Sequence, residues 1–292
     1  MNVSILVCTH KITYIPQSKI LFPVFVGRSR NNSINIPKSY LSDNVKDNIS
    51  DLNGSYCELT GLYWAWKNVD SDYVGLCHYR RYFSFRSKGK FKQVVNRFIH
   101  YCGHIYYAVA SQPKVGLYYP YQYTVRIESA LTKVVDSFEH DFIEWINDYP
   151  DCELFALKPV DKGTMSNYFQ FSSISGSHHL EIIRKVIASD FPEILPYYNK
   201  TLLSNKLFYA NMIIMKRELF QSYCKFLFSS LEKYNSILLQ EGYYLNTEEK
   251  SISRISGYMG ELLTSSFVSY YIANNQTERK YKLLYQVQYD PK

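Results

Sequence analysis

Short apolar runs alternate with longer amphipathic stretches along the chain of 292 residues. Runs of about four to eight apolar residues between polar or turn-forming residues are typical of buried strands, and apolar positions at the spacing of a helical turn predict helices. The predicted strands are Ser4–Thr9, Pro23–Gly27, Asp72–Cys77, Glu153–Leu157 and Phe208–Met215. The predicted helices are Ser55–Asn68 with Asn53 as its N-cap, a broken helix within Gln122–Tyr149, His178–Ser189, Arg217–Leu239 and Gly257–Ile272.

The order of these elements indicates the fold class. A strand, a helix and a second strand within the first 83 residues form a βαβ-like opening, which is typical of α/β proteins. No internal repeat, low-complexity segment or Gly/Ser linker divides the chain. We therefore predict a single α/β domain over residues 1–292, with helical elaborations around its sheet.

Composition narrows the class of protein. Apolar residues make up 46% and charged residues 20%, which excludes a disordered chain. The net charge of +7 fits an anionic ligand or a membrane surface, but it is too weak to indicate a nucleic-acid-binding protein. No apolar stretch has the length of a membrane span and the N-terminus lacks a signal-peptide pattern, so we expect a cytoplasmic protein. The six scattered cysteines are expected to be buried thiols.

The main candidate site directly follows the strand that ends at Cys77. His78, Arg80 and Arg81 place an imidazole and two guanidinium groups at the C-terminal end of a strand, where open α/β sheets bind ligands. Arginine also matches the geometry of phosphate oxygens. A solvated basic turn is the alternative. Seven Lys or Arg and no carboxylate occur from His78 to Phe98, with phenylalanines between them, which favours binding of a pyrophosphate, a lipid head group or nucleic acid.

Polar residues near the first strand and before the first helix are further candidates. Thr9, His10 and Lys11 follow the first strand and could contact a nucleotide, although a plain loop is nearly as well supported. Asp47 belongs to a polar cluster ahead of the helix, where helix capping would explain part of the pattern. Glu58 lies in an aromatic-rich helix, and we expect an arginine of the basic segment to pair with it.

The start of the last helix carries two more candidates. Arg254 and Glu261 flank a short stretch with Gly257 and Gly260, and glycines let a backbone approach a ligand closely. Glu261 could be a general base, or it could simply suit the positive end of the helix dipole. The sequence leaves these two roles open.

Two patterns resemble metal sites without fitting one well. Asp70 and Asp72 form a D-x-D pair that could hold a divalent cation, but they precede their strand and so lie at the end remote from the basic cluster. His100, Cys102 and His104 could share one face of a strand, but no fourth zinc ligand is evident. We expect no metal and no other cofactor, with a divalent cation as the alternative. The sequence contains no P-loop, G-x-G-x-x-G or G-x-S-x-G motif.

Several blocks of sequence resemble the bacterial DUF4422 family. They are ILVCTHK, DNIS followed by YCELTGLYWAWKN, DYVGLCHYRRYF, LFYANMIIMKRELFQSYCKFLFSSL and GYMGELL, and they span most of Ser4–Tyr271. Two departures stand out. The middle of the chain, Lys90–Gln170, is not similar to the family, and Leu262 stands where the family has an arginine after the glutamate.

The resemblance implies a glycosyltransferase of capsule, exopolysaccharide or O-antigen synthesis with a GT-A-like, Rossmann-related fold. It implies transfer of galactofuranose from UDP-galactofuranose. Our hypothesis adds that the transfer proceeds with inversion and that the acceptor is a lipid-linked glycan or an oligosaccharide. The implied parts are a nucleotide-binding part (1–83), a variable insertion that faces the acceptor or a membrane (84–170), a helical and sheet-completing part (171–273) and a tail (274–292).

The same resemblance, together with the chemistry of the residues, assigns expected roles. The nucleotide-sugar site is expected to comprise Thr9, His10, Lys11, His78, Arg80, Arg81 and Arg254. Glu261 is the first candidate for the base that takes the proton of the acceptor hydroxyl, and Asp47 and Glu58 are its rivals. Two alternatives remain: a transferase that uses UDP-galactopyranose or another nucleotide hexose, and a non-catalytic module that binds anionic lipid or nucleic acid through Arg80–Arg97. On the transferase hypothesis no nucleic-acid partner is expected, and contact with the membrane is peripheral, at its inner face.

Overall fold

A computed structural model describes residues 1–87, 102, 122–163, 165–242, 254–277 and 279–291. Its strands are β1 (Val3–Thr9), β2 (Leu21–Phe25), β3 (Leu41–Ser42), β4 (Tyr73–His78), β5 (Arg81–Ser84), β6 (Gln122–Val125), β7 (Leu154–Leu157), β8 (Val160–Asp161), β9 (Lys206–Leu207), β10 (Ile213–Lys216) and β11 (Tyr281–Tyr289). Its helices are α1 (Asn53–Tyr56), α2 (Leu59–Asn68), α4 (Glu128–Asp148), α5 (Asn167–Ser175), α6 (Ser177–Asp190), α7 (Leu195–Leu203), α8 (Arg217–Gln240) and α10 (Ile255–Asn274), with short 3₁₀ turns at Arg28–Arg30 and Ser50–Leu52.

Most of these strands form one mixed sheet. Their order is β10-β7-β11-β5-β4-β1-β2-β3, with β6 beside β11, and β10 also pairs with β4. The strands β2, β1 and β4 run parallel, whereas β10 lies antiparallel between β4 and β7. The ends of β1 and β4 therefore reach the same edge of the sheet, and the residues that follow both strands lie close together.

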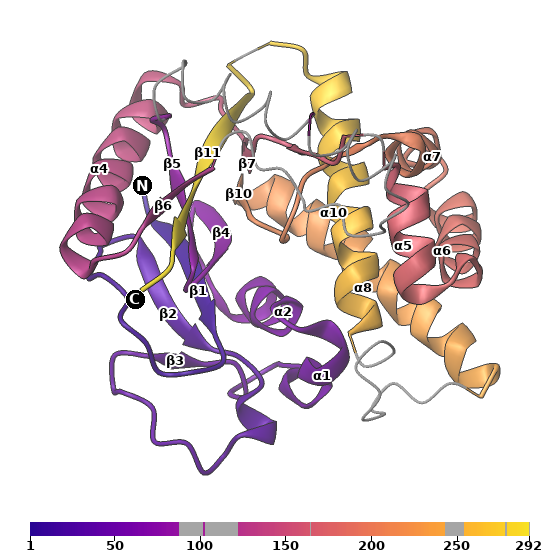
Figure 1. The fold of residues 1–292 in the computed structure, drawn as a ribbon, viewed down its shortest axis with the longest axis horizontal. Coiled ribbons are helices and arrows are strands. Elements are labelled where there is room, and N and C mark those ends of the chain that lie inside the picture. The colour runs from indigo at the N-terminus through magenta and orange to yellow at the C-terminus, as the bar shows by residue number, and fades with distance from the viewer. Residues whose placement is uncertain (88–101, 103–121, 164, 243–253, 278, 292) are drawn as a thin grey trace.

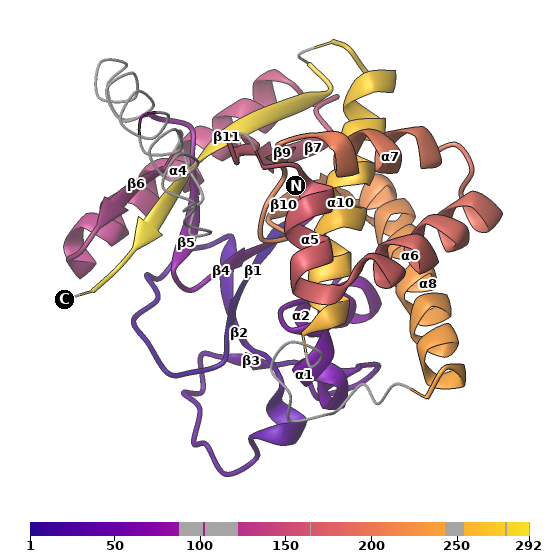
Figure 2. The same cartoon turned by 45° about the vertical axis from the view of Figure 1, so that its right-hand side comes forward.

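Helices cover both faces of the sheet (Figure 1). Alternation along β1 shows how the sequence produces these layers, because neighbouring side chains of a strand point to opposite faces. Val3, Ile5 and Val7 pack in the core beneath α4, and Leu6 and Cys8 belong to the larger core shared by α2, α8 and α10. Figure 2 shows α5, α6 and α7 stacked outside α10 and α8 on that second face. Among the described residues, no helix is both long and apolar enough to cross a bilayer.

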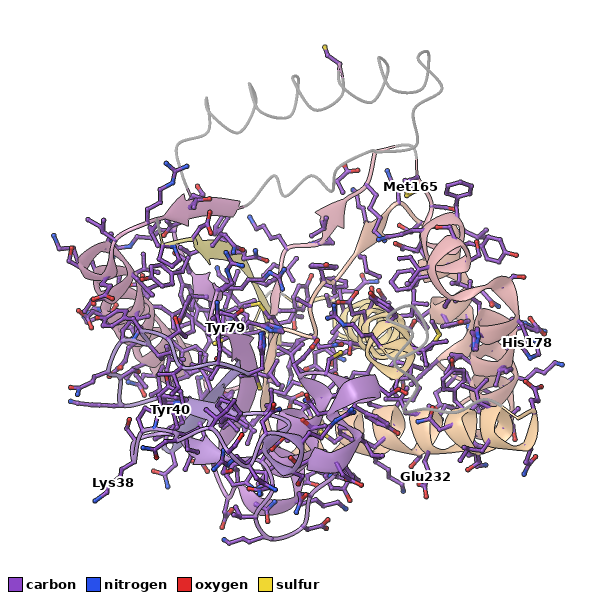
Figure 3. The ribbon with its side chains drawn as sticks, turned by 60° about the horizontal axis from the view of Figure 1, so that its bottom comes forward. Lys38, Tyr40, Tyr79, Met165, His178 and Glu232 are labelled. Carbon is purple, nitrogen blue, oxygen red and sulfur yellow. The ribbon has the colours of Figure 1, made fainter. Side chains whose placement is uncertain are left out.

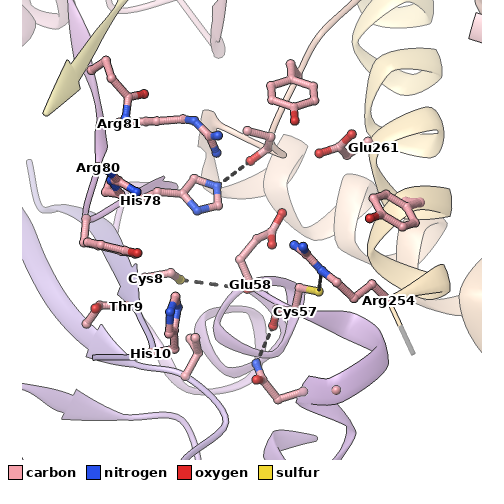
Figure 4. A pocket seen from close by; sticks show the side chains of 18 residues that line it. Cys8, Thr9, His10, Cys57, Glu58, His78, Arg80, Arg81, Arg254 and Glu261 are labelled. Atoms are coloured by element: carbon pink, nitrogen blue, oxygen red, sulfur yellow. Dashed lines mark hydrogen bonds between the residues drawn. The ribbon is translucent and has the colours of Figure 1, made fainter. Parts of the chain in front are cut away.

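The first predicted helix is in fact two helices. Cys57 has a positive φ of 52° and separates α1 from α2. Asn53 is therefore not the N-cap of one long helix. Its side-chain amide donates to the Cys57 carbonyl oxygen at 2.7 Å and to the Thr60 hydroxyl oxygen at 3.0 Å, which stabilises the break. The break turns Cys57 and Glu58 toward the edge of the sheet where β1 and β4 end (Figure 4).

The C-terminal segment is not a tail. β11 runs through the sheet, antiparallel to β5 and parallel to β6 and β7. Leu284, Val287 and Tyr289 are buried, and the polar Gln286 between them is buried as well. The polar residues of this segment favour a tail in the sequence. A strand that hydrogen-bonds on both sides can nevertheless bury glutamine side chains that find partners.

Two other element boundaries differ from the prediction. The segment expected to be a broken helix is a strand, β6, followed by the continuous helix α4. The strand expected over Phe208–Met215 begins only at Ile213, because Ala210 and Asn211 both have positive φ, 65° and 52°. These two residues form a left-handed turn, which few side chains other than glycine, asparagine and aspartate adopt readily. The other predicted helices and strands are confirmed to within a few residues.

Candidate active site

A cavity of about 620 Å³ lies where β1 and β4 end, between the sheet and α10 (Figure 4). This volume is within the range of about 300–1,000 Å³ that is usual for small-molecule sites. Figure 3 looks toward that end of the sheet, and Tyr79, a lining residue, lies between the sheet and the helical layer. The predicted site residues that line the cavity are Thr9, His10, Glu58, His78, Arg80, Arg81, Arg254 and Glu261. Segments from both ends of the chain thus build one site.

Two predicted site residues do not line this cavity. The Lys11 ammonium lies 5.3 Å from the ring centre of Tyr79, which itself lines the cavity. Asp47 accepts a hydrogen bond from the Tyr63 hydroxyl at 3.2 Å, and neither residue lines the cavity. The placement of Asp47 therefore removes it as a candidate base for a ligand in this cavity.

The patterns that resembled metal sites lie elsewhere. Asp70 pairs with Arg217, and the Asp72 carboxylate accepts from the backbone N–H of Asn2 at 2.7 Å, so both acids lie at the start of β4. Neither carboxylate lines the cavity. His100 and His104, and the basic residues from Lys88 onward in that segment, lie outside the described residues.

The three arginines of the site differ in how they are engaged. Arg80 forms a 2.6 Å ion pair with Asp290, and about half of its side chain is exposed. Arg81 lies 5.5 Å from the ring centre of Tyr209, and Arg254 donates its Nε–H to the Cys57 sulfur at 3.3 Å. Across the part of the chain that the structure describes, no carboxylate is within 4 Å of either of these two guanidinium groups. Arg81 and Arg254 are therefore the cations available to an anionic ligand.

His78 is held in one protonation state and one tautomer. Its Nε2 lies 2.8 Å from the Ala210 carbonyl oxygen. Because a carbonyl oxygen can only accept, Nε2 carries the hydrogen and Nδ1 keeps a free lone pair. Burial lowers the pKa of His78, and Arg81 lowers it further, while Glu58 opposes the change. His78 is consequently neutral at pH 7 and presents an acceptor, not a positive charge, to the cavity.

Two carboxylates face the same space as these cations. Glu58 does not pair with an arginine of the basic segment as predicted. Its Oε1 accepts from the side-chain amide of Asn211 at 2.9 Å. Glu261 lies in the second turn of α10, so a position at the helix start does not explain it. Burial, and next the charge of Glu58, raise the pKa of Glu261 to about 8.

The glycines near Glu261 serve packing between helices. A Cβ at Gly260 would lie 2.5 Å from Leu59 Cδ1, and one at Gly257 would lie 3.3 Å from the Cys57 sulfur. Both glycines therefore let α10 approach α1 and α2 closely, in place of the predicted approach of backbone to ligand. This contact sets the depth at which Glu261 enters the cavity.

Several lining residues were missed by sequence reasoning. They are Cys57, Tyr79, Tyr209, Ala210, Tyr258 and Gln288, among others. Tyr79 lies inside the HYRRYF block and Tyr258 beside the predicted glycines, so the sequence carries a local signal for both. Gln288 comes from β11, and no local signal connects it with the residues that follow β1 and β4, which lie far earlier in the chain.

The comparisons with known proteins agree with this architecture. A solved structure titled as the bifunctional glycosyltransferase WbbM, without ligand, superposes with a TM-score of 0.76 at 22% sequence identity. The match covers 99% of this chain and 46% of that protein, so the chain spans less than half of its length. A likeness at this identity establishes a shared fold, and it confirms the predicted GT-A-like arrangement of sheet and helices. A comparison with curated proteins found no match.

A family model also matches the chain. The model described as a domain of unknown function, DUF4422, matches residues 4–275. That range includes every lining residue discussed above except Gln288. The chain therefore belongs to the DUF4422 family.

Proposed function

We propose that the chain is a glycosyltransferase that moves a hexosyl group, galactofuranose from UDP-galactofuranose as the first candidate, to a glycan acceptor with inversion. One observation carries the proposal. In a fold shared with a glycosyltransferase, two arginines without carboxylate partners among the described residues, Arg81 and Arg254, face two carboxylates, Glu58 and Glu261, in one cavity. Charge of both signs in one cavity suits a reaction that releases an anion and removes a proton.

The residues have distinct roles in this reaction. Arg81 and Arg254 hold the diphosphate, and Thr9 and His10 line the nucleotide side of the cavity. The acceptor hydroxyl oxygen attacks the anomeric carbon, the bond from that carbon to the phosphate oxygen breaks, and the hydroxyl proton passes to ionised Glu261. The arginines stabilise the negative charge that develops on the departing UDP. Metal-independent catalysis is part of the proposal, because Asp70 and Asp72 do not line the cavity.

The acceptor side of the proposal rests on the surface and the net charge. We propose a lipid-linked or oligosaccharide acceptor of capsule, exopolysaccharide or O-antigen synthesis, reached from the cytoplasmic face of the membrane. The net charge of +7 and the exposed side chains of Tyr168, Phe169 and Leu203 support peripheral contact with an anionic bilayer. Sedimentation with vesicles that contain about one third anionic lipid, at low and high salt, measures this contact.

Release of UDP from a panel of UDP-sugars tests the proposal directly. The panel includes UDP-galactofuranose and UDP-galactopyranose, each with and without EDTA, since slow hydrolysis identifies the sugar donor even when the acceptor is unknown. Release from UDP-galactofuranose that EDTA does not change is the expected result. Release that requires a metal ion contradicts the metal-independent mechanism. No release and no UDP binding would favour another donor nucleotide first, and then the alternative of a non-catalytic module for anionic lipid or nucleic acid.

A further inference from the structure

A chain of buried hydrogen bonds leads from the helical layer to Glu58. The Tyr223 hydroxyl on α8 lies 2.7 Å from Thr264 Oγ1 on α10, which donates to Asn211 Oδ1 at 2.8 Å. The Asn211 amide nitrogen then donates to Glu58 Oε1 at 2.9 Å. Tyr223, Thr264 and Asn211 are each at most 1% exposed, and none of the three lines the cavity. These three residues therefore act on the site through Glu58, without lining the cavity themselves.

The direction of the bonds in this series follows from the orientation of the Asn211 amide. The single hydroxyl proton of Thr264 goes to Asn211 Oδ1, so Thr264 can only accept from Tyr223. With Oδ1 engaged in this way, Asn211 must present its N–H groups to Glu58. A flipped amide would place its oxygen against a carboxylate oxygen, which is tolerable only when Glu58 is protonated. Hydrogen bonds donated to the charged form stabilise that form.

The backbone beside Asn211 reaches the other two titratable groups of the site. The Ala210 carbonyl oxygen receives the Nε2–H of His78, and the Ala210 backbone acts on the pKa of Glu261, which it lowers. Ala210 and Asn211 are both left-handed, which costs about 1 kcal/mol or more for each residue of this kind. The Asn211 side chain, bonded on both sides, holds the turn in this conformation. One turn thus bonds to Glu58 and His78 and acts on the pKa of Glu261.

We propose that Asn211 is a positioning residue, held by Thr264 and Tyr223, which makes Glu58 the charged member of the carboxylate pair and leaves the proton on Glu261. The catalytic consequence rests on the proposed function, because Glu261 then gives up that proton before it accepts one from the acceptor. The assignment of charge within the pair does not depend on that function.

Other charged groups act on the two carboxylates without deciding between them. The groups that act on Glu58 are Cys8, Cys57, His78, Tyr223, Arg254 and Glu261, and those that act on Glu261 are Glu58, Cys57, Lys162, Arg81 and the Ala210 amide. Each carboxylate has at least one cation nearby and faces the other carboxylate. Burial acts strongly against a charge on Glu261. The hydrogen bond from Asn211 favours the charge on Glu58, so the two effects act in the same direction.

Thr264→Val is the sharpest perturbation, because it removes the hydroxyl and keeps the shape. Thr264→Ser restores the hydroxyl. Ser266→Ala is a matched control, since that buried hydroxyl donates to the Leu262 carbonyl of its own helix and to no other group in the described part of the chain. NMR titration of protein labelled with ¹³C in glutamate carboxyl groups measures the protonation of both residues directly. The signals are assigned with Glu58→Gln and Glu261→Gln.

In the unaltered protein at pH 7 we expect a charged signal from Glu58 and a protonated signal from Glu261. Thr264→Val should lower the titration midpoint of Glu261 by about half a pH unit or more, because the Asn211 amide is then free to turn. Thr264→Ser and Ser266→Ala should leave it unchanged. Tyr223→Phe gives a smaller change in the same direction and replaces Thr264→Val if that variant does not fold.

Two results would overturn the proposal: a protonated Glu58 beside a charged Glu261 at pH 7, or a Glu261 midpoint that stays the same in both Thr264→Val and Tyr223→Phe. The titration uses the free protein, so it stays informative if no UDP-sugar is turned over. Midpoints that shift in a protein without transferase activity would support the positioning role and refute the proposed function. Where activity is present, its pH profile should shift with the Glu261 midpoint.

Discussion

Replacing Glu261 with glutamine should stabilise the protein and abolish its activity. Burial and the neighbouring charge of Glu58 raise the pKa of Glu261 from 4.5 to about 8. In the unfolded chain this carboxyl group loses its proton near pH 4.5, whereas in the folded protein it holds the proton until about pH 8. Between these values the folded state binds more protons than the unfolded state, so stability falls as the pH rises. Glutamine resembles the protonated carboxyl group and avoids this loss.

The magnitude follows from the same two values. A difference of 1 pH unit corresponds to about 1.4 kcal/mol, which sets an upper limit of about 5 kcal/mol for the interval from 4.5 to 8. The Glu261 side chain is partly exposed and shares its titration with Glu58, so we expect about 2–4 kcal/mol. The gain in Glu261→Gln should be small near pH 5, grow steadily up to pH 8 and remain constant above it.

Urea unfolding at pH 5.5 and pH 8.5, followed by tryptophan fluorescence, measures this difference. Asp47→Asn is the control, because Asp47 is a carboxylate that does not line the cavity, and its effect should not follow the same pH dependence. UDP binding should persist in Glu261→Gln while transfer is lost by at least about 100-fold. The reasoning is refuted if Glu261→Gln has the same stability relative to the unaltered protein at both pH values.

The remaining predictions concern the cations, the pH profile and the scaffold. Arg81→Ala and Arg254→Ala should each weaken UDP binding by about tenfold or more in calorimetry. Arg80→Ala should weaken it by less than about threefold, because the Arg80 guanidinium already pairs with Asp290. Equal losses of affinity in all three variants would contradict the assignment. The rate of transfer should rise with pH up to about 8 and then level off, because Glu261 must be ionised to take a proton. A rate that falls over this range would exclude Glu261 as the base. Asp43→Ala should lower the free energy of unfolding by about 3 kcal/mol in urea titrations, because the buried carboxylate accepts hydrogen bonds from two backbone amides and two hydroxyl groups. A loss below about 1 kcal/mol would show that this network contributes little to stability.

The parts of the site that the sequence predicted are those defined by one local pattern. The apolar runs that end at Thr9 and at Cys77 are short and clear, and polar residues follow each of them directly. Neighbouring parallel strands end at the same edge of a sheet, so the two strand ends alone predict that Thr9 and His78 lie close together. Arg254 and Glu261 were candidates because they flank Gly257 and Gly260, and no rule of spacing connects them with these strands.

The parts that could not be predicted depend on contacts between distant segments. Arg80 and Arg81 are adjacent and chemically identical, yet only the position of β11 shows that Asp290 occupies the first and leaves the second available. The same strand supplies Gln288. Asn211 looked like part of an apolar strand, and its role in a left-handed turn emerges only when Glu58 and Thr264 lie on either side of it.

The unfavourable features of this site are concentrated in one small volume and offset by packing outside it. A carboxyl group with a raised pKa and two left-handed residues meet at Ala210, where the chain passes between β4 and α10. Each would relax in an isolated segment. They persist because Gly260 lets α10 pack tightly against Leu59 and because the turn is bonded to both neighbouring helices. A substitution at Gly260 should therefore affect Glu261 through helix packing alone, so loss of activity in Gly260→Ala should be accompanied by loss of stability, unlike the loss in Glu261→Gln.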